Sequence, residues 1–307
     1  MYTTKRRTFI KAASGAVALS LMGFSTDWGK RKSPLLSFST LGCPDWNFRK
    51  IIDFAAEHQY NGIEFRGILR ELDLTKCPEF SDANIAETIA LMKERNLRFA
   101  DLGSSCSLHH AKPDERKKNL DEGKRFIDLA KKINCPYVRV FPNNLPKDQD
   151  RNETIQLIIS GLLELGKYAS GSNVSVLMES HGELVNVNEL KHIMESAKHP
   201  NVGLVWDVVN MWFVNKVAPV VIYNSLKPFI RHTHIKDLNI VDNKEQYTFL
   251  GKGVTPIFDA IDLLYKDNFP GFYSFEWEKL WHPEIPEPEI ALANYPSIMK
   301  THFDQIS

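Results

Sequence analysis

Four acidic or histidine residues in the second half of the chain each end a short apolar run. The residues are Glu179, Asp207, His234 and Glu276. The run before each one is rich in β-branched, aromatic or other apolar residues, which is typical of a buried strand. Three carboxylates and one imidazole make a hard, mostly oxygen ligand set. Such a set suits Mn²⁺, Mg²⁺, Co²⁺ or Zn²⁺ and contains no soft ligand that would favour copper.

The spacing of these residues fits a repeating strand–helix unit. Asp207 follows Glu179 by 28 positions and His234 follows Asp207 by 27, whereas the 42 positions before Glu276 leave room for an extra loop. Successive strand–helix units bring the carboxyl ends of their strands to one face of a sheet or barrel. A single buried carboxylate is as often part of an ion pair. Four such residues at successive strand ends favour a metal site, because buried unpaired charge is rare.

A site of this kind supports removal of a proton beside a carbonyl group. A divalent cation polarises the carbonyl and stabilises an enediolate, and a glutamate takes the proton. Return of the proton to the other face gives an epimer, and return to the neighbouring carbon gives an isomer. Loss of a leaving group one carbon further on gives an elimination. The residues alone leave these three outcomes open.

Further polar side chains share the expected strand ends. Lys236 lies two positions after His234, so a strand directs both to the same side. There its ammonium could neutralise an enediolate oxygen or pair with a carboxylate. His181, two positions after Glu179, could bind a substrate hydroxyl, assist proton transfer or be a plain loop residue. The rival ligands are His232 and Glu278, each two positions from a predicted ligand.

The whole chain alternates between strand-like and helix-like segments. Four strands are expected before the ligand-bearing ones, at 35–41, 62–66, 99–102 and 137–141. Helices are expected at 48–56, 81–95 with Ser81 as the cap, 114–132, 152–169, 188–197, 217–227 and 256–267. Eight strands alternating with helices predict a (β/α)₈ TIM barrel. No G-x-G-x-x-G motif follows the first strand, which disfavours a doubly wound open sheet.

Glu64 and Arg66 share one face of the second strand and could form an ion pair or touch substrate.

Composition narrows the class of protein. The 307 residues are 43% hydrophobic, enough for one barrel of roughly 250 residues with additions. The formal net charge is zero and no basic patch stands out beyond the N-terminus, so nucleic acid is not an expected partner. None of the four cysteines forms a C-x-x-C pair, and both free thiols and a disulfide fit the sequence.

The N-terminus has the pattern of a targeting segment. Lys5-Arg6-Arg7 precedes an uncharged run from Ala12 to Phe24 that is short for a membrane span. The adjacent arginines indicate a twin-arginine signal, with an ordinary secretory signal or an uncleaved anchor as alternatives. We therefore predict an export signal and linker at 1–30 and a barrel with a C-terminal extension at 31–307. The predicted location is the periplasm or another exported one, with no stable membrane insertion after export.

Several short motifs within residues 35–303 resemble one family. They are Gly62-Ile63-Glu64, Glu179-Ser180-His181-Gly182, Trp206-Asp207, His234-Ile235-Lys236-Asp237, Gly251-Lys252-Gly253 and Phe275-Glu276. They resemble the xylose-isomerase-like TIM barrel superfamily and its sugar phosphate isomerase/epimerase branch. The resemblance implies one divalent metal held by Glu179, Asp207, His234 and Glu276, with the two glutamates also acting as acid and base. Many relatives carry a histidine where this chain has Asn210.

The resemblance and the residues together predict a metal-dependent sugar isomerase or epimerase, with Glu179, Glu276, Lys236 and His181 as catalytic residues. The substrate is expected to be an unphosphorylated sugar, because no phosphate-cradling glycine loop is present. The alternatives are a lyase or dehydratase on a keto-sugar or keto-glycoside, a metal-dependent endonuclease or hydrolase, and a non-catalytic sugar-binding barrel. A homo-oligomer is possible, since relatives often form dimers or tetramers.

Overall fold

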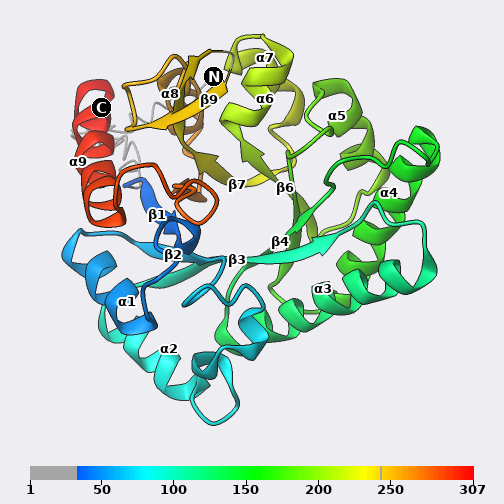
Figure 1. Cartoon of the computed structure of the whole chain (residues 1–307), viewed down its shortest axis with the longest axis horizontal. Helices are drawn as coiled ribbons and strands as arrows, with labels where there is room; N and C mark the ends of the chain where they lie inside the picture. Colours follow the sequence, from blue (N-terminus) through cyan, green and yellow to red (C-terminus); the bar gives the residue numbers. More distant parts are fainter. Residues whose placement is uncertain (1–32, 243) are drawn as a thin grey trace, which may run out of the picture. The chain divides into compact units, whose positions relative to one another are not determined.

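Eight parallel strands close into a barrel in the order β1-β10-β7-β6-β5-β4-β3-β2 (Figure 1). The structure is a computed structural model that describes residues 33–242 and 244–307. The barrel strands are β1 (Leu35–Ser39), β2 (Gly62–Phe65), β3 (Arg98–Ser107), β4 (Tyr137–Phe141), β5 (Ser175–Glu179), β6 (Val202–Asp207), β7 (Ile230–Ile235) and β10 (Phe272–Phe275). The predicted (β/α)₈ barrel is confirmed. The predicted export signal and its boundary at residue 30 lie outside the described residues.

Helices surround the ring of strands (Figure 1). They are α1 (Phe48–Glu57), α2 (Ile85–Glu94), α3 (Pro113–Ile133), α4 (Arg151–Tyr168), α5 (Val187–Ser196), α6 (Val208–Asn215), α7 (Pro219–Leu226), α8 (Ile257–Lys266) and α9 (Pro288–Ile306). Single 3₁₀ turns lie at η1 (Thr40–Gly42), η2 (Leu74–Lys76) and η3 (Pro78–Phe80). Among the described residues, no helix is long and apolar enough to cross a membrane.

The strands are buried on both faces, and the two faces differ in chemistry. In β2 the side chains of Ile63 and Phe65 are fully buried, and the ring of Phe65 stacks on Phe48 of α1 at 5.8 Å. Glu64 lies between them in sequence and is equally buried, and its contacts reach β7 and β10 instead. Alternation along a strand therefore directs apolar side chains to the helices and polar ones to the barrel interior.

Three local predictions differ from the structure. Helix α2 begins at Ile85, because Ser81 belongs to the preceding turn, where its hydroxyl donates to Pro78 O. Strand β3 extends beyond its predicted end at residue 102 to Ser107, with a register irregularity against β4. The long gap before Glu276 contains an antiparallel hairpin rather than an irregular loop. The hairpin consists of β8 (Asp237–Val241) and β9 (Lys244–Thr248).

Helix α9 packs where the last barrel strand meets the first. The ring of Tyr295 stacks on Phe275 of β10 at 4.6 Å, and its hydroxyl donates to Tyr273 O at 3.0 Å. Tyr60, just before β2, donates from its hydroxyl to Leu292 O at 2.6 Å. The predicted C-terminal helical extension therefore covers the outside of the barrel beside β10 and β1.

Candidate metal centre

The four predicted ligands meet at the carboxyl ends of their strands. Glu179 ends β5, Asp207 ends β6, His234 lies near the end of β7, and Glu276 follows β10. Parallel pairing places Asp207 opposite His234 and His234 opposite Ser274. One ligand atom of each of the four side chains lies within 4.8 Å of the others, and all four residues are buried. The barrel thus gathers residues that are up to 97 positions apart in the sequence.

His234 is the centre of this cluster. Its Nδ1 lies 3.1 Å from Glu179 Oε1 and 3.2 Å from Glu276 Oε1. Burial by itself lowers the pKa of His234, but Glu276, Glu64 and Glu179 outweigh it and raise the pKa well above its usual value. The carboxylates of Glu179 and Glu276 therefore strongly favour positive charge at Nδ1 of His234.

Asp207 is oriented by the start of a helix. It is the N-cap of α6, and its Oδ1 accepts the backbone N–H of Asn210 at 2.8 Å. Its own N–H donates to Ser180 Oγ at 2.9 Å. Capping residues have extended backbone and a side-chain oxygen turned toward the first turn, which fixes the carboxylate. Asn210, the departure from the family pattern, therefore contacts the predicted ligand Asp207 through its backbone.

Lys236 lies against the acidic cluster. Its Nζ is 2.8 Å from Asp207 Oδ2, 2.7 Å from Glu276 Oε2 and 2.7 Å from Glu278 Oε1. Glu278 also accepts a hydrogen bond from the hydroxyl of Tyr247 in β9 at 2.7 Å. Burial lowers the pKa of Lys236, but the carboxylates, Asp207 first, outweigh it and keep the ammonium charged.

The two predicted acid–base glutamates have opposite electrostatic surroundings. Burial alone raises the pKa of Glu179, but His234 and Arg139 outweigh it and hold the pKa below its usual range. The Nε of Arg139 lies 3.2 Å from Glu179 Oε2. Burial raises the pKa of Glu276 to about 7, opposed by His234 and Lys236. Pairs of carboxyl groups pushed apart in this way are suited to separate acid and base roles.

The chemistry of the cluster fits a divalent cation. Three buried carboxylates converge on one imidazole, and both Glu179 Oε2 and Asp207 Oδ2 are buried without a well-aligned hydrogen bond. Arg139 and Lys236 lie against these two oxygens, but two cations do not balance three buried carboxylates, and uncompensated buried charge costs several kcal/mol. Oxygen-rich sets with one imidazole are ligands for Mg²⁺, Mn²⁺ or Zn²⁺. Glu179, Asp207, His234 and Glu276 are therefore the residues that would hold the metal.

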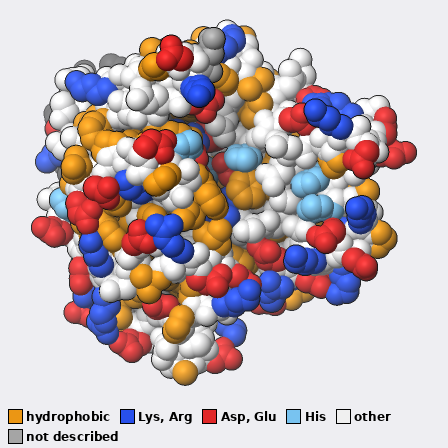
Figure 2. Space-filling model, viewed as in Figure 1, with side chains coloured by type: hydrophobic (Ala, Val, Ile, Leu, Met, Phe, Trp, Pro, Cys, Tyr) orange, Lys and Arg blue, Asp and Glu red, His pale blue; other side chains and the backbone are white. Residues whose placement is uncertain are grey.

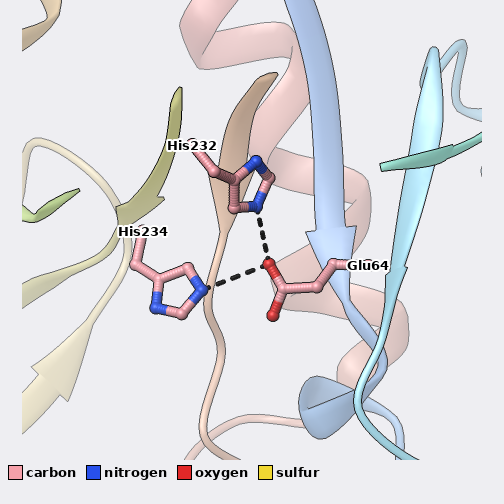
Figure 3. Close-up of side chains that lie close together, drawn as sticks. All are labelled: Glu64, His232 and His234. Carbon is pink, nitrogen blue, oxygen red and sulfur yellow. Dashed lines mark hydrogen bonds and ion pairs between the residues drawn. The ribbon is translucent and has the colours of Figure 1, made fainter. Parts of the chain in front are cut away.

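A second buried group lies beside the cluster and contains the rival ligand His232. The rings of His232 and His234 both point at one carboxylate oxygen of Glu64 (Figure 3). Burial raises the pKa of Glu64, but His234 and His232 outweigh it and hold the pKa well below its usual value. His232 thus bonds to Glu64 and lies outside the four-ligand cluster. The other rival, Glu278, contacts Lys236.

The remaining sequence candidates are distributed around the site. His181 packs its ring on Phe141 at 4.8 Å, and its Nδ1 is buried without a hydrogen-bond partner. Arg66 donates to Ser105 Oγ at 3.1 Å, and burial together with Arg139 lowers its pKa to about 9. Sequence reasoning missed Tyr247, because no motif marks a residue of the unexpected hairpin as part of the site.

The molecular surface is hollowed over the barrel strands. Figure 2 shows this hollow near the centre of the view, with histidine side chains on both sides of it. Among the described residues, two clusters have the geometry of a metal site, and neither includes His109 or His110. These two histidines stack on each other at 4.1 Å. His109 and His110 therefore lie outside both candidate metal clusters of the described residues.

Known proteins share this fold at low sequence identity. A 3-dehydroshikimate dehydratase of Bacillus anthracis is 20% identical over 231 residues, which cover 70% of this chain and 78% of that protein. The crystal structure of a probable 3-DHS dehydratase from Bacillus anthracis superposes with a TM-score of 0.72 at 17% identity. The match covers 87% of this chain and 98% of that one.

Two further solved structures extend the comparison to epimerases and metal binding. The 3-keto-D-glucoside 4-epimerase of E. coli gives a TM-score of 0.70 at 13% identity, covering 87% of this chain and 99% of that one. The IolI protein with a bound zinc atom gives a TM-score of 0.70 at 18% identity, and the match covers 86% of this chain and 96% of that one. At these identities the likeness shows the fold alone. Residues 52–295 match the xylose isomerase-like TIM barrel family over most of the chain, so the chain belongs to that family.

Proposed function

We propose that this protein is a divalent-metal-dependent sugar isomerase or epimerase that removes a proton beside the carbonyl of an unphosphorylated carbohydrate. The observation that carries the proposal is the convergence of four buried ligand atoms within 4.8 Å of one another. A charged ammonium, that of Lys236, lies against the same cluster. The similar proteins include a dehydratase and an epimerase, and both activities support proton removal beside a carbonyl as the reaction class.

The chain's own side chains divide the proton transfer between them. A divalent cation bound by the four ligands would polarise the substrate carbonyl and stabilise the enediolate. Glu179 is held ionised by His234 and Arg139, so it is the base that accepts the proton. Glu276 lies beside the same nitrogen of His234 as Glu179, and it would return a proton to the product.

Lys236 and His181 act on the oxygen atoms of the substrate. The buried ammonium of Lys236 is placed to neutralise negative charge that develops on an enediolate oxygen, and the low dielectric of the interior strengthens this effect. His181 Nδ1 is buried with no partner among the described residues, which leaves it free for a substrate hydroxyl. Both residues are proposed to stabilise or orient the substrate rather than to remove the proton.

Elimination by a lyase or dehydratase is the second candidate. The observation that favours it is the buried ammonium of Lys236, which donates to Glu278 Oε1 beside the Tyr247 hydroxyl. This ammonium could give a proton to a leaving group on a keto-sugar or keto-glycoside after the same first step. The similarity to the dehydratase of Bacillus anthracis supports elimination. The similarity to the epimerase of E. coli supports epimerisation to the same degree.

Deuterium exchange tests the proposal directly. The metal-loaded protein is incubated in D₂O with free ketoses, their phosphates and keto-glycosides, and proton NMR follows the C–H signal beside the carbonyl. Loss of that signal establishes proton abstraction, and the product spectrum then separates epimer, isomer and elimination. Faster exchange with a ketose phosphate than with the free ketose would contradict the unphosphorylated substrate. Lack of exchange with every substrate, in protein that holds metal, would overturn the proposal.

Replacement of the proposed base gives the matching prediction. The substitution Glu179→Gln removes the carboxylate that takes the proton, so the exchange rate should fall at least about 100-fold. Glu189→Gln serves as the control, because Glu189 lies on α5 and pairs with Arg151. The control should exchange at the wild-type rate. Exchange retained in Glu179→Gln would rule Glu179 out as the base.

A further inference from the structure

Glu64 reaches the metal cluster from the other side of the barrel. It lies on β2, and β2 pairs with β1 and β3, whereas the histidines lie on β7. The contact therefore crosses the barrel interior. All three of its described hydrogen bonds go to one oxygen, Oε2. They come from His232 Nε2 at 2.9 Å, His234 Nε2 at 3.2 Å and Ser274 Oγ at 3.0 Å.

The geometry at His234 assigns different tasks to its two ring nitrogens. Nδ1 faces the oxygens of Glu179 and Glu276. Nε2 faces Glu64 (Figure 3). An ionised carboxylate only accepts hydrogen bonds, so the nitrogen that faces Glu64 carries a hydrogen. Nδ1 is the nitrogen that points into the ligand cluster, so it is the atom that would bind a cation after losing its own hydrogen. A carboxylate bonded to the second nitrogen of a histidine ligand fixes both the tautomer and the orientation of the ring.

We propose that Glu64 is the positioning residue of the metal centre. Its carboxylate holds His234 so that Nδ1 is presented to the cation, and Glu64 itself does not bind the metal. His232 and Ser274 bond to the same oxygen and keep it in place. The inference rests on the proposed metal-dependent function, because it concerns how the same site acquires its ligand geometry.

The substitution Glu64→Gln tests this role by direct metal binding. It keeps the size of the side chain and removes its charge, so affinity for Co²⁺ should fall about 10- to 100-fold. The visible absorption of bound Co²⁺ should also change, because His234 is no longer held in one orientation. Asp101→Asn is the matched control: Asp101 is another fully buried interior carboxylate, on β3, and its oxygens have no described hydrogen bond. The control should change affinity less than about threefold with an unaltered spectrum.

The outcomes separate the inference from the proposed function. Wild-type protein that binds no divalent cation would overturn the proposed function. Wild-type protein that binds Co²⁺, with Glu64→Gln binding as tightly and with the same spectrum, would overturn the positioning role alone. Equal losses of Co²⁺ affinity in Glu64→Gln and Asp101→Asn would also overturn it. Removal of any buried negative charge near the site would then explain the loss.

A measurement on the wild-type protein keeps the inference testable if Glu64→Gln does not fold. Nitrogen-15 NMR of the Zn²⁺-loaded protein reports the tautomer of the histidine ligand. The expected result is a hydrogen on Nε2 of His234 with Nδ1 bound to the metal. A hydrogen on Nδ1 would contradict the proposal without reference to any variant.

Discussion

His234 illustrates how one side chain acquires its role from residues far away in the sequence. Its Nδ1 lies among the oxygens of Glu179 and Glu276, and its Nε2 lies against Glu64. These carboxylates come from β5, from the residue after β10 and from β2. The charge on the ring and the direction in which Nδ1 points are set by these three surrounding carboxylates.

Metal binding should depend on pH through the same residues. The pKa of Glu276 is raised to about 7 and that of His234 is raised further above its ordinary value, so protons compete with the cation for both groups. Affinity should therefore rise with pH across this range. It should change about tenfold per pH unit where only His234 is protonated, and about 100-fold per unit below pH 7, where both groups are protonated. Titration calorimetry at pH 8, 7 and 6 measures the fall. An affinity that is constant over this range would show that neither group is a ligand.

At the scale of elements, the β8–β9 hairpin is the addition that sets this barrel apart from eight plain strand–helix units. It delivers Tyr247 to Glu278 and thereby supports the ion pairs of Lys236. Asp237 holds the base of the hairpin to the loop that follows. Its Oδ2 accepts the N–H groups of Gly251 and Gly253, both at 2.9 Å.

A methyl group at Gly253 should break this connection. An added Cβ would meet Asp237 Oδ1 and Leu238 O well inside contact distance, and both are held by the hairpin. We expect Gly253→Ala to lower the free energy of unfolding by ~1–3 kcal/mol, measured by urea denaturation. The control is Lys252→Ala at the exposed neighbouring position, which should change stability by less than ~0.5 kcal/mol. Equal stability of the two variants would mean that the loop adjusts freely.

At the scale of the whole molecule, the barrel and the N-terminal segment are separate units. Ser33–Ser307 forms one compact unit, and the segment before it lies outside the described residues. We propose that this segment exports the barrel after it has folded, because twin-arginine signals of the Arg6-Arg7 type direct export. Folding before export would allow the metal centre to be loaded inside the cell.

Replacement of the two arginines tests the export proposal. With Arg6 and Arg7 both changed to lysine, the positive charge is kept but the twin-arginine motif is lost. We expect the protein to remain in the cytoplasm, as measured by cell fractionation, while the wild-type chain appears in the periplasm. Export of the double variant at the wild-type level would favour an ordinary secretory signal instead.

Periodicity was enough to predict the barrel and to place the proposed ligands at strand ends, whereas the choice of His234 over His232 came from the resemblance to the family motif. Alternation within the strands and the 27- and 28-residue spacing of the ligands are local features that follow from strand–helix units. Because parallel units place their carboxyl ends together, the meeting of Glu179, Asp207 and His234 follows from the order of these units along the chain. The side on which Lys236 lies followed from the two-residue period of a strand.

Contacts across the barrel were decided only by the tertiary structure. Glu64 and His232 are 168 positions apart, and nothing in their local sequences chooses between an ion pair with Arg66 and a bond to His232. The same holds for Tyr247, since β9 is polar and most of its residues are exposed, unlike those of the barrel strands. Sequence patterns report the burial of a side chain, whereas the partner of a buried polar group depends on closure of the barrel. Closure is a property of all eight strands together, and it determines which interior groups face one another.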